Sequence, residues 1–214
     1  MKVASGLKAP GGRGSIIVIS APSGSGKSTL VKRLMRAVPN LVFSISHTTR
    51  PPRAGEKHGR EYFFESLQRF RRMIARGEFA EWAEVVGHLY GTSEKQVRAA
   101  QDSGKDVLLD IDVQGHRRIR RRFPEAVSIF VLPPSFQELE RRLKRRHSDS
   151  GEQVRLRLEV ARKEITHWPE YDYLVVNYHL PACTQALRAL LTAARLRRKN
   201  QAERAQVICK TFGG

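Results

Sequence analysis

Cysteine and long apolar runs are both scarce in this chain. Its 214 residues include only two cysteines, Cys183 and Cys209, which excludes a disulfide framework and a CxxC metal site and is typical of a reducing, cytoplasmic compartment. No apolar run approaches the about 20 residues that a transmembrane helix needs, so we expect no membrane association. Residues 1–13 are basic without an apolar core, which predicts a flexible leader rather than a signal peptide.

Acidic residues are also in short supply. The 21 Asp and Glu residues face 39 Lys and Arg residues, so the formal net charge is +18. This surplus predicts attraction to polyanions: nucleic acid, an acidic membrane face or small molecules that carry phosphate. Composition alone does not choose among them. Hydrophobic residues make up 40% of the chain, which excludes wholesale disorder and suffices for a core at this length.

Short apolar runs alternate with helical patterns along the chain. Helices are expected over about 27–38, 93–104, 114–122, 135–146, 152–167 and 182–198. The alternation predicts an α/β fold, with a five-stranded, mostly parallel sheet flanked by helices. Residues 46–92 break this pattern, since they are turn-rich and aromatic, and we expect an insertion with its own small sheet and one helix. The five predicted strands are Ser15–Ser20, Leu41–Ile45, Val107–Ile111, Val127–Leu132 and Tyr173–Val176.

A glycine-rich loop follows the first predicted strand and ends in Gly-Lys-Ser, which is the ending of a P-loop. Gly24 and Gly26 let backbone N–H groups turn inward around phosphate oxygens, and Lys27 reaches the β- and γ-phosphates of a nucleoside triphosphate. The Ser28 hydroxyl is a candidate Mg²⁺ ligand. Ala21 stands where the strict pattern has glycine, outside the part that wraps the phosphate. The alternative is a Gly/Ser turn that merely ends a strand. The predicted triphosphate-binding residues are Ala21, Pro22, Ser23, Gly24, Ser25, Gly26, Lys27 and Ser28.

Several further motifs resemble those of guanylate kinase, in that family's order and spacing, from about Gly14 to Ala194. The resemblance implies a P-loop NTPase fold with a GMP-binding insertion at about 46–92 and a helical lid at about 135–166, and it leaves 195–214 as a basic tail. It also implies transfer of the γ-phosphoryl group of ATP, with Mg²⁺, to GMP or dGMP in purine metabolism. The motifs are Ser46–Glu56, Gly59 with Tyr62, Glu81–Ala83, Tyr90–Thr92, Leu109–Gly115, Val131–Ser135 and Tyr171–Asn177.

By this resemblance, one group of residues binds GMP. Glu81 would accept hydrogen bonds from guanine N1–H and its exocyclic amine, because an ionised carboxylate only accepts and adenine has an acceptor at N1. Arg50 and Arg53 would hold the GMP phosphate together with Tyr62 and Tyr90. Taken alone, the arginines also fit a solvated basic turn, and the tyrosines also fit core aromatics. Asp112 would lie near the guanine and the metal's water shell, whereas Asp110 is assigned a structural role. The GMP-binding residues are Ser46, Arg50, Arg53, Tyr62, Glu81, Tyr90, Thr92 and Asp112.

A second group would act on the transferring phosphoryl group. The nucleophile is already an anionic phosphate oxygen, so alignment and charge neutralisation suffice and no general base is needed. The arginines of this group that follow Pro134, Arg142 and Arg146, also fit a solvated basic helix. The family's lid turn is Gly-Arg-Gly, whereas this chain has Arg145–His147 at that place. The family's Val-Asn-Asp motif is Val176–Tyr178 here, and of it the resemblance assigns only Asn177, as a contact near adenine. The catalytic residues implied by the resemblance are Lys27, Arg142, Arg146 and Arg157.

Three other functions also fit parts of this sequence. A catalytically silent guanylate-kinase-like binding module usually has a degraded P-loop, whereas this chain keeps Gly-Lys-Ser. A nucleic-acid-binding protein would suit the charge, but the basic runs lack interleaved aromatics, so we expect no specific nucleic acid, only weak salt-sensitive RNA binding. A kinase for another nucleoside monophosphate is disfavoured by Glu81. The sequence leaves the oligomeric state open, a homo-oligomer included.

Overall fold

The computed structural model describes residues 12–85, 87–145 and 151–212. Its main sheet has five strands, all parallel, in the order β2-β7-β1-β8-β9. Each strand falls within one residue or so of a predicted apolar run, except that β2 is shorter than expected. The predicted α/β fold is therefore confirmed. The strands are β1 (Ile16–Ser20), β2 (Leu41–Phe43), β7 (Asp106–Asp110), β8 (Val127–Leu132) and β9 (Tyr173–Val176).

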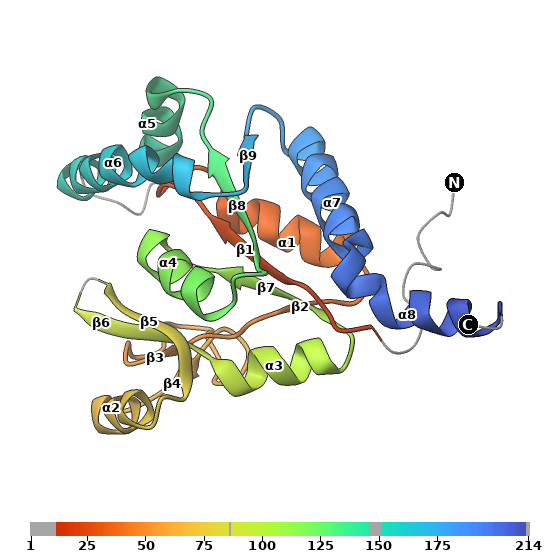
Figure 1. Ribbon diagram of the computed structural model, residues 1–214. Coiled ribbons are helices and arrows are strands. Elements are labelled where there is room, and N and C mark those ends of the chain that lie inside the picture. Colours follow the sequence, from red (N-terminus) through yellow and green to blue (C-terminus); the bar gives the residue numbers. More distant parts are fainter. Residues whose placement is uncertain (1–11, 86, 146–150, 213–214) are drawn as a thin grey trace.

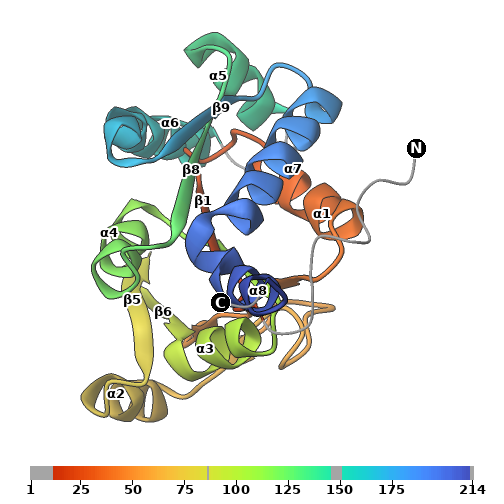
Figure 2. The same cartoon turned by 45° about the vertical axis from the view of Figure 1, so that its right-hand side comes forward.

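Helices cover both faces of this sheet (Figures 1 and 2). Because side chains alternate along a strand, Ile17 and Ile19 of β1 pack on one face, and Ile16 and Val18 pack on the other. The first face lies under α1 (Lys27–Ala37) and α7 (Leu180–Leu196), and the second under α3 (Glu94–Asp102) and α4 (Val113–Arg122). A strand buried on both faces must be apolar throughout, which is why the runs were visible in the sequence.

The insertion forms a second sheet with one helix, as expected. Its strand order is β4-β3-β6-β5, and only β3 and β4 pair in parallel. Phe70 of the helix is fully buried and stacks on Phe79 with ring centroids 4.5 Å apart. The elements are β3 (His47–Thr48), β4 (Phe63–Phe64), α2 (Leu67–Ala75), β5 (Phe79–Val85) and β6 (His88–Ser93).

The segment predicted as a lid consists of α5 (Phe136–Lys144), α6 (Gly151–Glu164) and the 3₁₀ turn η1 (Ile165–Glu170). The hydroxyl of Ser135 accepts from the Glu138 N–H at 3.1 Å and caps α5, as its capping pattern predicted. In both views, α5 and α6 lie at the opposite end of the molecule from α2 and the small sheet (Figures 1 and 2). The main sheet therefore stands between them.

Several boundaries differ from the predictions. The helix expected over 152–167 ends at Glu164 and tightens into η1, which contains Pro169. The closing helix ends at Leu196, and a further helix, α8 (Arg198–Lys210), occupies most of the expected tail. The expected leader, 1–13, lies outside the described residues up to position 11. Among the described residues, no helix combines the length and apolar character that crossing a bilayer requires.

Phe70 should be essential to the insertion. We expect Phe70→Ala to lower the free energy of unfolding by about 3–5 kcal/mol, because it leaves a cavity against Phe79. Leu67→Ala on the same helix is the control, since Leu67 is 47% exposed, and it should change stability by no more than about 0.5 kcal/mol. Urea unfolding of both variants measures the difference, and equal losses would contradict the packing described here.

Candidate functional site

The P-loop joins β1 to α1 through two glycines in the left-handed region. Their φ angles are +89° at Gly24 and +88° at Gly26, which other residues adopt only with strain. A Cβ atom on Gly26 would lie 2.6 Å from the side-chain nitrogen of Asn177, so the loop and Asn177 meet as closely as glycine allows. Ser28 and Thr29, in the first turn of α1, remain exposed.

Two predicted site residues hold this loop in place. The Asn177 amide donates to the Ser25 carbonyl at 2.7 Å, and Arg142 donates to the same carbonyl at 3.4 Å and to the Asn177 carbonyl at 3.0 Å. The Glu138 carboxylate fixes the Arg142 guanidinium at 2.7 Å. Arg142 and Asn177 also line a cleft of about 460 Å³ that reaches Gly26. Helix α5 and the end of β9 therefore both support the loop.

Lys27 ties the P-loop to the carboxyl end of β7. Its Nζ lies 2.6 Å from Asp110 Oδ1 and donates to the Ile111 carbonyl at 3.5 Å. The Ser20 hydroxyl donates to that carbonyl too, at 2.8 Å. The sequence predicts only a structural role for Asp110. The signal was present, since an acid that ends a buried strand beside the P-loop strand lies at the edge where α/β proteins bind ligands.

Glu164, at the end of α6, was missed altogether. The Ser23 N–H of the P-loop donates to Glu164 Oε2 at 3.2 Å. Burial raises the pKa of Glu164, with the Ser23 hydrogen bond and Lys27 opposing that rise. No local pattern in the sequence connects a helix-ending glutamate to a loop about 140 positions earlier, so this contact required the structure.

The insertion gathers one arginine and two tyrosines. The rings of Tyr62 and Tyr90 are 5.9 Å apart, and the Arg50 guanidinium lies 5.3 Å from the Tyr62 ring centroid. Both oxygens of Glu56 accept from Arg50 Nη2 at 2.9 Å, and one also accepts from the Arg53 N–H at 2.8 Å. Arg53 itself is exposed on the same turn. Glu56, which the sequence reasoning did not assign, thus orders the arginine turn.

Glu81 is a buried carboxylate that Thr92 holds in place. It is 6% exposed, and the Thr92 hydroxyl donates to its Oε1 at 2.6 Å. Its Oε2 lies so near Gly115 that a Cβ there would be 2.9 Å away, and Asp112 Oδ1 accepts from the Gly115 N–H at 2.8 Å. Burial raises the pKa of Glu81 to about 7, with Asp112 adding to the rise and Thr92 and Arg118 opposing it.

A cleft of about 610 Å³ separates the P-loop helix from the insertion. Ser28 and Asp110 line it from the core, and Ser46 and Tyr62 line it from the insertion. Of the remaining predicted residues, Arg157 lies on α6 and Arg146 lies outside the described residues. The cleft therefore lies between the start of α1, where the P-loop ends, and the insertion.

The sequence model of the guanylate kinase family matches residues 13–194. The chain belongs to the guanylate kinase family. The match covers the P-loop, the insertion, the lid and the sheet, and it ends before α8.

Individual relatives agree with this assignment. A guanylate kinase from Gluconobacter oxydans is 50% identical over 190 residues, which cover 88% of this chain and 91% of that protein. One from Aromatoleum aromaticum is 47% identical over 191 residues, covering 89% and 94%. The crystal structure of guanylate kinase from Anaplasma phagocytophilum superposes with a TM-score of 0.73 at 35% identity, covering 88% and 90%. The predicted family, fold and enzyme class, a nucleoside monophosphate kinase, are confirmed.

The raised pKa of Glu81 predicts how stability depends on pH. The folded-state value of about 7 exceeds the usual 4.5, so the folded protein holds a proton that the unfolded chain releases, and stability falls as pH rises between these values. Glu81→Gln removes this titration and keeps an acceptor for Thr92. We expect the free energy of unfolding of Glu81→Gln, relative to that of the natural protein, to increase by about 2 kcal/mol between pH 5.5 and pH 8. Urea unfolding at both pH values measures it, and a difference that does not change with pH would contradict this.

Proposed function

We propose that this member of the guanylate kinase family transfers the γ-phosphoryl group of ATP to GMP or dGMP, giving ADP and GDP. The observation that carries the proposal is the buried Glu81 carboxylate beside Thr92, in the insertion whose Ser46 and Tyr62 share a cleft with Ser28. Its oxygens match the two donors of guanine, N1–H and the exocyclic amine. Adenine would leave this buried group facing its N1 acceptor, and a site of this kind rejects such a base strongly.

On the acceptor side, the remaining insertion residues suit a nucleoside monophosphate. Arg50, held by Glu56, and Arg53 would bind the GMP phosphate, and the hydroxyls of Tyr62 and Tyr90 would donate to it. Their neighbours complete the base contacts in this proposal: Ser46, which lines the cleft, Thr92 and Asp112.

On the donor side, the P-loop amides and the start of α1 would bind the ATP phosphates, in addition to Lys27. Arg142 already reaches the loop through the Ser25 carbonyl. Arg157 on α6 and Arg146 are assigned from the family motif to the transferring group. Asn177 lines the cleft on the Arg142 side, where we place the adenosine. The ATP-binding set proposed here is Ala21, Pro22, Ser23, Gly24, Ser25, Gly26, Lys27, Ser28 and Asn177.

The residues at the cleft fit a magnesium ion that arrives with ATP. Ser28 offers an exposed hydroxyl and Asp110 a carboxylate on the same wall, and Mg²⁺ prefers such oxygen ligands together with phosphate oxygens. We assign Ser28 as the ligand. When bound, the ion would neutralise charge on the phosphates.

The side chains of this protein would then contribute to catalysis only by orienting the substrates and by stabilising charge. The attacking GMP phosphate oxygen is already an anion, so no side chain has to remove a proton. Asp110 fixes the Lys27 ammonium at 2.6 Å, at the carboxyl end of β7. The arginines supply positive charge where negative charge develops on the transferring group. In this proposal residues 14–194 form the catalytic domain, 46–92 the acceptor part and 135–166 the lid.

Two broader expectations belong to the same proposal. Both cysteines are free, Cys183 buried and Cys209 exposed, which suits a cytoplasmic location. The intact Gly26, Lys27 and Ser28 favour catalysis over a silent binding module.

Measuring ADP release with GMP, AMP, CMP, UMP and dTMP as acceptors tests this function. We expect turnover with GMP to exceed that with each of the others by at least about a hundredfold, since the buried carboxylate is left unpaired by other bases. A preference for any of the other four acceptors would overturn the base assignment.

Lys27→Ala should lower turnover steeply while GMP still binds. Its matched control is Lys95→Ala, which removes the same charge from the exposed surface of α3. Unchanged turnover in Lys27→Ala would remove Lys27 from the mechanism, and loss of GMP binding would indicate misfolding of the site instead.

A further inference from the structure

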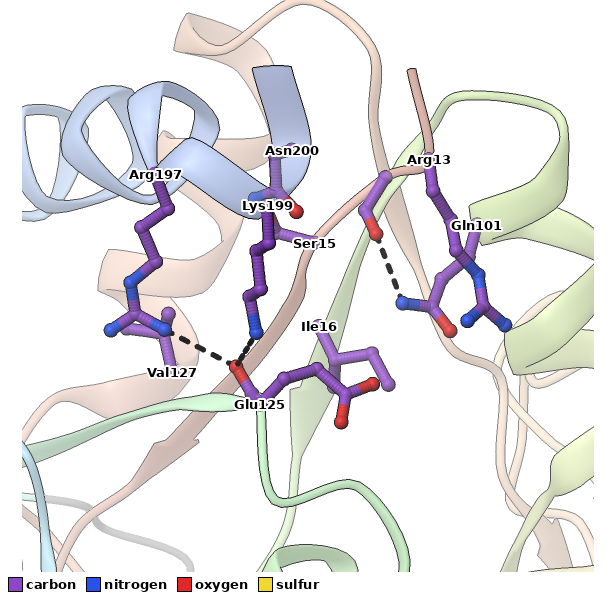
Figure 3. Close-up of a pocket in the computed structure, with 10 residues that line it drawn as sticks. Arg13, Ser15, Ile16, Gln101, Glu125, Val127, Arg197, Lys199 and Asn200 are labelled. Carbon is purple, nitrogen blue, oxygen red and sulfur yellow. Dashed lines mark hydrogen bonds between the residues drawn. The ribbon is translucent and has the colours of Figure 1, made fainter. Parts of the chain in front are cut away.

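A second cavity, of about 390 Å³, lies at the other end of the main sheet. Ser15 and Ile16 line it where β1 begins, and Val127 lines it where β8 begins (Figure 3). Strand β1 runs from this cavity to the P-loop, a span of about 16 Å. The cavity and the cleft described above are therefore separate sites that do not share a residue.

Cations from the region after α7 converge in this cavity. Arg197 donates to the Glu125 carbonyl at 3.2 Å, and Lys199 donates to the same oxygen at 3.4 Å (Figure 3). One neutral carbonyl oxygen thus accepts from two cations at this contact. Burial lowers the pKa of Lys199, and the neighbouring Arg197 lowers it further, while Glu125 opposes this. Arg13 adds a third cation at the rim, paired with Asp102 at 3.1 Å.

A buried acceptor without a donor faces the same space. Gln101 is 2% exposed, and its amide nitrogen donates to the Gly14 carbonyl at 2.9 Å. Its oxygen is buried and has no hydrogen-bond partner. Gln101 lines the cavity, and in Figure 3 its side chain is drawn on the other side of the cavity from Arg197 and Lys199. Leaving such a group unpaired costs about 1–3 kcal/mol, so a ligand that brings a donor would gain from it.

We infer that this cavity binds a phosphomonoester that also carries hydroxyl groups, the chemistry of a sugar phosphate or a nucleotide. Arg197 and Lys199 would hold the phosphoryl oxygens, and a ligand hydroxyl would donate to Gln101 Oε1. The charges favour an anion, whereas Gln101 and the Glu125 carboxylate favour donors on the same molecule. The family match ends at residue 194, so Arg197, Lys199 and Asn200 add this site to the family domain.

Titration of the ¹⁵N-labelled full chain with ribose 5-phosphate, followed by NMR, tests the inference residue by residue. We expect saturable shifts of the backbone amides of Gly14, Gln101 and Lys199, with a midpoint that differs from any shift at Gly24 in the P-loop. Inorganic phosphate should bind the cavity more weakly, because it lacks the sugar hydroxyls. AMP is the third ligand: tighter binding than ribose 5-phosphate would identify a nucleotide site, and weaker binding a sugar phosphate site.

The decisive variant is Lys199→Ala, which should weaken ribose 5-phosphate binding at the cavity by about tenfold, since it loses a charge-assisted hydrogen bond. Lys210→Ala removes the same charge from the far end of α8 and should leave the affinity unchanged. Absence of saturable shifts at the cavity amides would overturn the inference. So would equal affinities for natural protein and Lys199→Ala, or equal affinities for ribose 5-phosphate and inorganic phosphate.

Discussion

The ammonium group of Lys27 lies between Asp110 and the Ile111 carbonyl, 2.6 Å and 3.5 Å away. This contact joins the start of α1 to the end of β7, the strand beside β1, and so fixes the P-loop at the carboxyl edge of the parallel sheet. It depends on the loop geometry at Gly26, where no larger residue fits against Asn177. From this edge the chain continues through Asp112 into α4, where the proposed acceptor site begins.

A short chain of contacts links the P-loop edge of the main sheet to Glu81 in the insertion. Asp112 caps α4 through the Gly115 N–H, and Gly115 lies against Glu81 of the inserted sheet. Helix α4 thereby fixes the Glu81 carboxylate, which would recognise guanine, relative to the edge of the main sheet. Burial keeps that carboxylate near half-ionised at neutral pH, with a pKa of about 7. A base that donates two hydrogen bonds would favour its ionised form, which couples base recognition to the charge of the site.

The sequence could predict the parts of this fold that obey local rules. Strands buried on both faces are apolar throughout. Ser93 and Ser135 begin capping patterns that predict two helix starts, and both serines cap their helices in the structure. The P-loop was visible because its glycines and lysine are contiguous. Contacts between distant segments could not be predicted, because no periodicity relates Glu164 to Ser23. The break at Arg197 and the helix that follows were missed for another reason: their residues are polar and show no amphipathic pattern to place them on the core.

In this account, donor and acceptor occupy two separate sites, the donor at the P-loop and the acceptor on the insertion, and bind together, so phosphoryl transfer occurs within a ternary complex. Calorimetric titration of GMP into the protein, alone and saturated with a non-hydrolysable ATP analogue, tests this most directly. The account predicts one GMP per chain in both titrations, with the analogue still bound. Displacement of the analogue by GMP, or loss of GMP binding when the analogue is present, would show a single shared site and contradict it.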